Sequence, residues 1–179
     1  MAQPRLTRVI GAVNIGSFRI AAIIAGITET GELIVLGSAH RAAQGIKRGY
    51  VTDMAAATYA VRDAIDRAEK QAQTSVGPVL IGTAGAGLAS QVAQVEVAIG
   101  GRRGRRGGHY TLDGAHGVSN PRGLHAERLG VDIHVMLADG APIRNLTEAV
   151  QQAHLEVEAV VGPPIAARHA FPTPRERVL

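Results

Sequence analysis

The sequence predicts an α/β fold in which a β-rich segment separates two helices. Three observations support this: apolar runs with short turns in the first forty residues, a helical periodicity after Asp53, and a second helical stripe after Pro142. The length of 179 residues suits one domain or two small ones. Aromatic residues make up only 3 % of the chain and Trp is absent, so the core must consist of Val, Ile, Leu and Ala.

The first forty residues predict three consecutive strands. The apolar, β-branched runs are Val9–Ile15, Ile20–Thr28 and Leu33–Gly37. Gly16-Ser17 separates the first two runs, and the turn-forming stretch 29–32 separates the last two. Short turns between consecutive strands predict an antiparallel meander.

The strongest helical pattern follows a loop at Gln44–Gly49. Apolar residues recur every three or four positions from Met54 to Ala72, and Asp53 is placed to cap the first turn. The polar face predicts two i,i+4 ion pairs: Asp63–Arg67 and Asp66–Lys70.

The rest of the chain alternates strands with loops and one further helix. The pattern predicts a loop at Asp113–Gly123 and a helix starting near Pro142. After Gly162-Pro163-Pro164, it predicts a tail that frays after one turn of helix. The strands are expected at Val79–Gly82, Val92–Val97, His109–Leu112, Arg128–Leu137 and Leu155–Val161.

The net charge of +4 has a local origin in Arg102, Arg103, Arg105 and Arg106. Without these four residues, 15 basic side chains balance 15 acidic ones. An Arg-Gly tract can bind phosphates through salt-sensitive contacts. This tract contains no aromatic residue for base stacking, so a solvated connector at Gly100–Gly108 is the favoured interpretation, with anionic-polymer binding as the alternative. Nucleic acid is not an expected partner.

Other chemistries find little support in the sequence. The chain has no Cys, and its seven His are scattered without metal-ligand spacing, so no metal ligand and no catalytic residue is assigned. Gly82–Gly87 is similar to a dinucleotide fingerprint, but an alternating strand pattern follows it instead of a helix. The apolar run Ile20–Ile27 is too short to span a bilayer, which needs about 20 residues. A cytosolic protein is expected.

The turn within Val13–Arg19 allows two interpretations. A turn with Gly and a hydroxyl residue can present backbone N–H groups to a phosphate. It can equally be an ordinary hairpin, which the pattern alone favours.

Three segments together resemble the family of the bacterial cell-division protein FtsA. Asn14-Ile15-Gly16-Ser17 is similar to the family's first phosphate motif, and Gln44–Asp53 is similar to its GIKRG signature before a long helix. Pro142–Val157 resembles the family's later helix and strand, and Gly82–Gly87 its glycine-rich strand end. The resemblance covers nearly all of this chain and the N-terminal half of the family's length.

The resemblance implies an actin/Hsp70-like ATPase fold, which is ribonuclease H-like. Residues 1–83 and 139–179 would form the first actin-like subdomain, which is incomplete. Residues 84–138 would form the small β-rich subdomain that FtsA carries as an insertion, here shortened and bridged by the connector 100–108.

The resemblance also implies ligands and partners. The family binds ATP with Mg²⁺, which points here to phosphate contacts from Asn14, Ile15, Gly16, Ser17 and Arg19. Its members assemble the division ring, tether it to the membrane and recruit later division proteins. The implied partners are the tubulin-like ring protein, late division proteins and further copies of the chain. The implied location is the cytoplasmic face of the inner membrane at the division site, with only indirect membrane contact.

Several departures from the family pattern lower the expected nucleotide affinity. Asn14 replaces the usual Asp, and Arg19 replaces the usual Lys. Gly162-Pro163-Pro164 stands where the family has a helix, and no second lobe is recognised. We therefore expect a truncated form that acts through protein contacts and binds ATP weakly at most. The alternative is an ATPase that completes its cleft with another chain.

Overall fold

The computed structural model describes residues 5–83, 85, 87–98, 109–118, 120–121 and 123–170. Their mixture of helices and sheets confirms the α/β prediction. The chain divides into two compact units. One takes in the described part of residues 1–88 and 138–167, and the other takes in the described part of 89–137 and 168–179.

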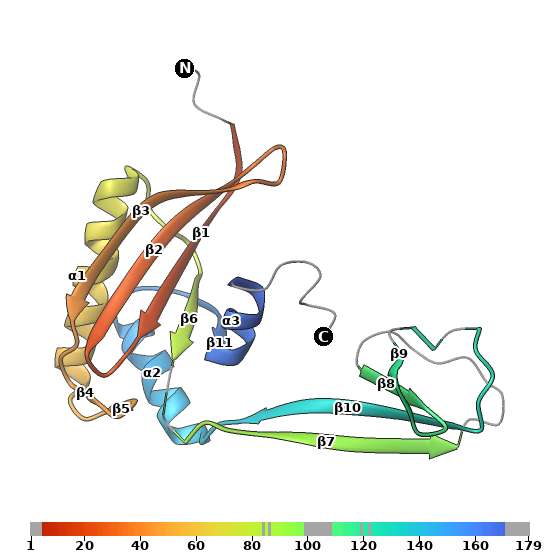
Figure 1. The fold of residues 1–179 in the computed structure, drawn as a ribbon. Coiled ribbons are helices and arrows are strands. Elements are labelled where there is room, and N and C mark those ends of the chain that lie inside the picture. The colour runs from red at the N-terminus through yellow and green to blue at the C-terminus, as the bar shows by residue number, and fades with distance from the viewer. Residues whose placement is uncertain are drawn as a thin grey trace. The chain divides into compact units, whose positions relative to one another are not determined.

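The first unit is built on a five-stranded mixed sheet. Its strands are β1 (Leu6–Ile15), β2 (Arg19–Thr28), β3 (Leu33–Ala42), β6 (Val79–Thr83) and β11 (Val157–Val161). The order across the sheet is β11-β6-β1-β2-β3 (Figure 1). The predicted meander β1-β2-β3 is antiparallel, whereas β6 runs parallel to both of its neighbours.

Two helices, α1 (Met54–Ala72) and α2 (Gly140–Gln152), cover one face of this sheet (Figure 1). The alternation of the strands sends Val13 and Ile15 of β1 toward the helices, where both are buried. Most α1 residues in the core are small, which lets the helix lie close to the sheet. The buried residues of α1 are Ala57, Ala60, Val61, Ala64, Ile65 and Ala68.

Helix α1 forms as the sequence predicts. The Asp53 carboxylate accepts a hydrogen bond from the Ala56 amide at 3.0 Å, so the predicted N-cap is confirmed. The predicted Asp63–Arg67 pair is present at 2.9 Å. The predicted Asp66–Lys70 pair was wrong, because Asp66 contacts Arg62 at 2.7 Å. The Arg62 guanidinium also donates to the Ala153 carbonyl, which fixes it beside Asp66.

Two short hairpins overlap segments that the sequence pattern assigned to loops. The first joins β4 (Ile46–Lys47) to β5 (Tyr50–Val51), and the second joins β8 (His109–Leu112) to β9 (Ala115–Val118). Both turns consist of two residues with positive φ. They are Arg48 (52°) with Gly49 (82°), and Asp113 (48°) with Gly114 (83°). Such turns suit the twist of antiparallel strands. The loop predictions were therefore wrong at β4 and β9, whereas the predicted strand His109–Leu112 is confirmed as β8.

The remaining differences concern the ends of elements. Strand β3 continues to Ala42 because its backbone keeps pairing with β2 as far as Arg19. Helix α2 starts two residues before Pro142, and β11 starts at Val157. The tail forms the eight-residue helix α3 (Pro163–Ala170) instead of a single turn, so the expectation that the prolines replace a helix was wrong. Proline fits there because the first helical turn has no partner for its N–H groups.

The second unit contains a four-stranded antiparallel sheet. It adds β7 (Ala89–Ala98) and β10 (Arg128–Leu137) to the hairpin β8-β9, in the order β7-β10-β8-β9. Apolar residues of β10 and β7 lie opposite each other: Leu129 is paired with Val97, and Val131 with Val95. Tyr110 and Leu112 of β8 are paired with the same two β10 residues and are buried.

Across the part of the chain that the structure describes, no helix is both long and apolar enough to cross a lipid bilayer.

Candidate functional site

The turn between β1 and β2 is held by backbone hydrogen bonds on both sides. The Gly16 amide donates to the Arg19 carbonyl at 3.1 Å, and the Ala43 amide donates to the Phe18 carbonyl at 2.9 Å. The turn is therefore fixed both to β2 and to the chain leaving β3. The side chains of Ser17, Phe18 and Arg19 are exposed at its tip.

Ser17 joins this turn to the β4-β5 hairpin. Its Oγ accepts a hydrogen bond from the buried Gly49 amide at 2.8 Å. The hairpin is closed from the other side by the Gly45 carbonyl, which accepts from the amides of Thr52 at 2.7 Å and Asp53 at 3.2 Å. The two segments that carry the main family resemblance therefore form one assembly that also sets the start of α1.

The turn keeps several donors free. Among the described residues, no backbone hydrogen bond uses the amides of Ser17 and Phe18, and no carboxylate forms an ion pair with Arg19. Two adjacent amides and a guanidinium are groups that bind a phosphate. The turn therefore fits an anion.

The same turn does not fit a metal ion. Asn14 presents a neutral amide where a carboxylate would serve Mg²⁺. The described residues contain no group of three His, Asp or Glu side chains close enough to hold a metal. We therefore derive no step through Mg²⁺ at this site.

A shallow cavity of about 340 Å³ lies beside the turn and brings Asn14 and Arg19 together. Its polar lining also includes Ser38 and His40 of β3. Sequence reasoning missed His40, which lies opposite Ala21 only because β3 extends beyond its apolar run. Ile15 differs from the other predicted site residues because its side chain is buried in the core, so only its backbone can contact a ligand.

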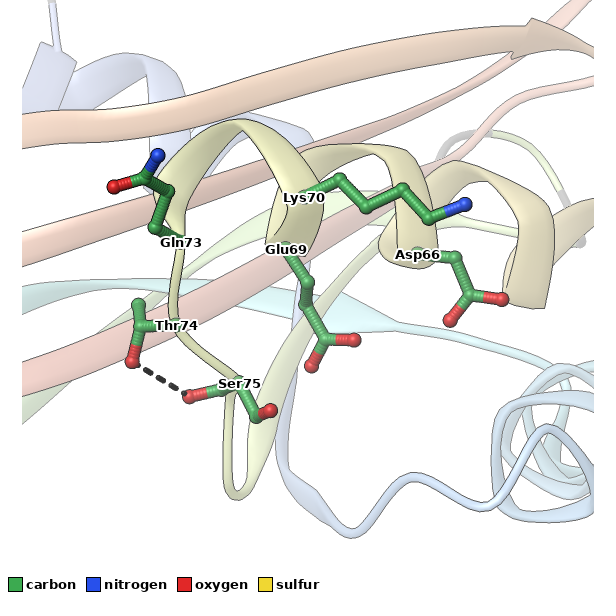
Figure 2. A pocket seen from close by; sticks show the side chains of 6 residues that line it. All are labelled: Asp66, Glu69, Lys70, Gln73, Thr74 and Ser75. Atoms are coloured by element: carbon green, nitrogen blue, oxygen red, sulfur yellow. Dashed lines mark hydrogen bonds between the residues drawn. The ribbon is translucent and has the colours of Figure 1, made fainter.

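A second cavity, of about 310 Å³, lies at the C-terminal end of α1 (Figure 2). Its lining residues are Asp66, Glu69, Lys70, Gln73, Thr74 and Ser75. The helix C-terminus and two carboxylates disfavour an anion there. Glu69 also accepts a hydrogen bond from the Val76 amide at 2.9 Å, which indicates a structural role. Helix α1 is about 28 Å long, and this cavity lies toward its C-terminal end, away from the N-cap Asp53 that follows the β4-β5 hairpin.

Two other sequence features have different outcomes. The segment Gly82–Gly87 leads into a strand, as the alternation predicted, because β6 ends at Thr83 and β7 begins at Ala89. The four arginines of the connector, Arg102, Arg103, Arg105 and Arg106, lie outside the described residues. Anion binding by that tract stays a prediction.

Comparison with protein families supports the resemblance. Residues 108–137 match the family described as the SHS2 domain inserted in FtsA, and they lie within the second unit. The chain is 26 % identical to FtsA of Rhizobium meliloti strain 1021, covering 90 % of this chain and 44 % of that protein. It is 24 % identical to FtsA of Pseudomonas aeruginosa over 100 % of this chain and 49 % of that protein. It is 23 % identical to FtsA of Escherichia coli K12 over 96 % of this chain and 47 % of that protein. The chain thus spans about half the length of these relatives.

Solved structures show the fold. The PilM–PilN type IV pilus biogenesis complex contains a chain that matches with a TM-score of 0.61 at 12 % identity, covering 89 % of this chain and 49 % of that one. The ethanolamine utilization protein EutJ of Carboxydothermus hydrogenoformans matches with a TM-score of 0.53 at 16 % identity, covering 94 % and 42 %. Both have the actin-like ATPase fold. The motifs, the family match and these likenesses agree: the chain has an actin-like ATPase fold and is an FtsA-like protein.

Proposed function

We propose that this chain is a cell-division protein that acts through protein contacts and binds nucleotide phosphates weakly. The observation that carries the proposal is the bond from Gly49 to Ser17, which unites the two FtsA-like segments into one turn-and-hairpin assembly. Similarity to FtsA over 90 % or more of the chain supports the same role. Residues 84–138 would be the inserted subdomain, and 1–83 with 139–179 would be the first actin-like subdomain.

The proposed role in the cell follows that of the relatives. The chain would take part in assembly and membrane tethering of the division ring and in recruitment of later division proteins. Its partners would be the tubulin-like ring protein, late division proteins and copies of itself. Its membrane association would be indirect, at the cytoplasmic face of the inner membrane.

The nucleotide contacts would lie at the phosphate end. The free amides of Ser17 and Phe18 and the Arg19 guanidinium would hold the phosphates, and Asn14 would donate its amide N–H groups beside them. Bound ATP would supply a phosphoanhydride, but these residues include no carboxylate for a metal or a water. Contacts at one end leave most of the ligand exposed, which lowers its affinity.

Binding to defined partners tests the proposal. The full chain would be purified and titrated separately with full-length FtsA, the tubulin-like ring protein and the cytoplasmic segments of late division proteins from the same organism. We expect saturable binding to at least one of them by biolayer interferometry. Absence of binding to every member of this set would contradict the proposed function.

The second candidate is an ATPase that completes its cleft with another polypeptide. It is favoured by the free turn amides and by Arg19, which has no carboxylate partner among the described residues. In this case, phosphate release with ATP and Mg²⁺ would exceed that of an Asn14→Ala, Ser17→Ala double variant once the partner chain is added. Equal release from both proteins would exclude it.

A further inference from the structure

Among the described residues, no strand pairs with the outer edge of β7 in the second unit. Among the described residues it is paired only with β10, over ten consecutive residues from Ala89 to Ala98. In an antiparallel pair, every second residue directs its N–H and C=O away from the partner strand. The outer edge of β7 therefore offers a row of backbone donors and acceptors.

This edge lacks the features that usually prevent pairing. Natural edge strands are protected by proline, lysine, bulges or short length. Strand β7 is ten residues long, is paired with β10 without a bulge, and carries a single charge, on Glu96. Its valines are exposed: Val92 by 67 %, Val95 by 44 % and Val97 by 50 %.

We propose that β7 pairs edge to edge with β7 of a second copy, antiparallel, around a two-fold axis at Val95. The sequence of the strand matches itself in this register: Val95 faces Val95, Ala93 faces Val97, Val92 faces Ala98, and Gln94 faces Glu96. Apolar residues thus meet apolar residues, and the carboxylate meets an amide. An axis at Glu96 would instead set two glutamates opposite each other.

The proposed pairing continues a surface already present in one copy. Val95 and Val97 share an apolar face with their β10 partners Val131 and Leu129. Joining two β7 edges would extend this face across both copies. Seven paired residues bury less area than the 1,200–2,000 Å² or so of a stable interface, so the dimer should depend on protein concentration. This inference gives a surface for the self-association named in the proposed function and rests on that part of it, whereas the tests with other partners and with phosphate do not involve the β7 edge.

Cysteine cross-linking of the full chain tests the register, since the natural sequence has no cysteine. Residues opposite each other in an antiparallel pair have Cα atoms about 4.5–5.5 Å apart, within the range of a disulfide. Val95→Cys should therefore form a disulfide-linked dimer under mild oxidation, in a yield that rises with concentration. Ile133→Cys is the matched control, because Ile133 is equally exposed at 45 % but lies on β10. Ile133 is paired with Ala93, which lies two residues from the proposed axis, so its two copies would be about 20 Å apart: three strand spacings across and four residues along the strands. Equal cross-linking of both variants, or none of Val95→Cys, would overturn the proposal.

A pair of charge variants tests the same register without cysteine. Gln94→Lys would face Glu96 of the second copy, whereas Gln94→Glu would face it with a like charge. Sedimentation equilibrium should give dimer dissociation constants about tenfold apart, with the lysine variant tighter than the natural chain. Equal far-ultraviolet circular dichroism spectra would show that both variants fold. If both Gln94→Lys and Gln94→Glu dimerise more weakly than the natural chain, this pairing is contradicted.

Discussion

The Gly49 amide donates a 2.8 Å hydrogen bond to Ser17 Oγ across 32 residues of sequence. Gly49 adopts a positive φ of 82° as the second residue of the turn between β4 and β5. In this conformation, the Gly49 N–H points toward Ser17 in the turn between β1 and β2, and not into the β4-β5 turn. The phosphate-motif turn and the signature hairpin are therefore held in one geometry.

Removal of the Ser17 hydroxyl should destabilise the first unit. Ser17→Ala leaves the buried Gly49 amide without its acceptor, which should lower the free energy of unfolding by about 1–3 kcal/mol. Urea unfolding followed by circular dichroism measures this change. Ser17→Thr keeps the hydroxyl and should lose less than half as much. Equal losses for the two variants would show that the hydroxyl is not the cause.

The close approach of β3 to α1 depends on Gly37. A Cβ at this position would contact the Ala68 carbonyl and lie 2.7 Å from the Ala72 amide nitrogen, so the helix would have to move. Gly37→Ala should cost about 1–3 kcal/mol of stability. Gly77→Ala is the control, because a Cβ there meets no atom within 4 Å. A thermal unfolding midpoint unchanged by Gly37→Ala would refute this packing.

Asp63 should give the protein an acid-sensitive contribution to stability. Arg41 of β3, at 2.8 Å, is the main cause that lowers the pKa of this carboxyl, and Arg67 adds to it. A carboxyl with a lowered pKa in the folded protein stabilises the fold. This stabilisation is complete at pH values above the pKa of the unfolded chain, near 3.9, and is lost as the pH falls through the pKa of the folded protein. The natural chain should therefore exceed Asp63→Asn in melting temperature at pH 7, and the difference should shrink below pH 4. A difference that stays constant down to pH 2 would argue against this ion pair.

Phosphate binding at the turn should depend on Arg19 and not on Mg²⁺. Isothermal titration with inorganic tripolyphosphate should show weak binding that Arg19→Gln reduces about tenfold or more, because a charge-assisted hydrogen bond is lost. Asn14→Asp should weaken metal-free binding through like-charge repulsion and make it respond to Mg²⁺. Tight binding that requires Mg²⁺ in the natural chain would contradict the assignment of Asn14.

The parts of the fold that the sequence predicted are those with a strong periodic signal. Helix α1, its cap at Asp53 and the β1-β2-β3 meander follow from apolar spacing and local capping. Strand β9 also had a local signal, the Asp113-Gly114 pair that follows the predicted strand His109–Leu112, but its Gly- and His-rich surroundings favoured a loop. The extension of β3 to Ala42 had no local sequence signal, because it depends on backbone pairing with β2.

The candidate phosphate site at the β1-β2 turn, like the fold, was predictable from the sequence only in part. Its residues at the turn, from Asn14 to Arg19, could be chosen from the Gly-Ser pattern and the family resemblance. The contacts of Ser17 with Gly49 and the position of His40 could not, because both join segments more than 15 residues apart. Such contacts depend on strand register and on a positive-φ turn, which periodicity does not encode.

The central claim is that this FtsA-like chain works in cell division, and its location in dividing cells tests that claim most directly. A fluorescent fusion of the full chain, expressed at low level in its own organism, should concentrate at the division site in constricting cells, with the fluorescent protein alone as the control. Midcell enrichment severalfold above that control is the predicted result. Fluorescence that stays uniform through constriction, from a fusion shown to be intact and folded, would contradict the account.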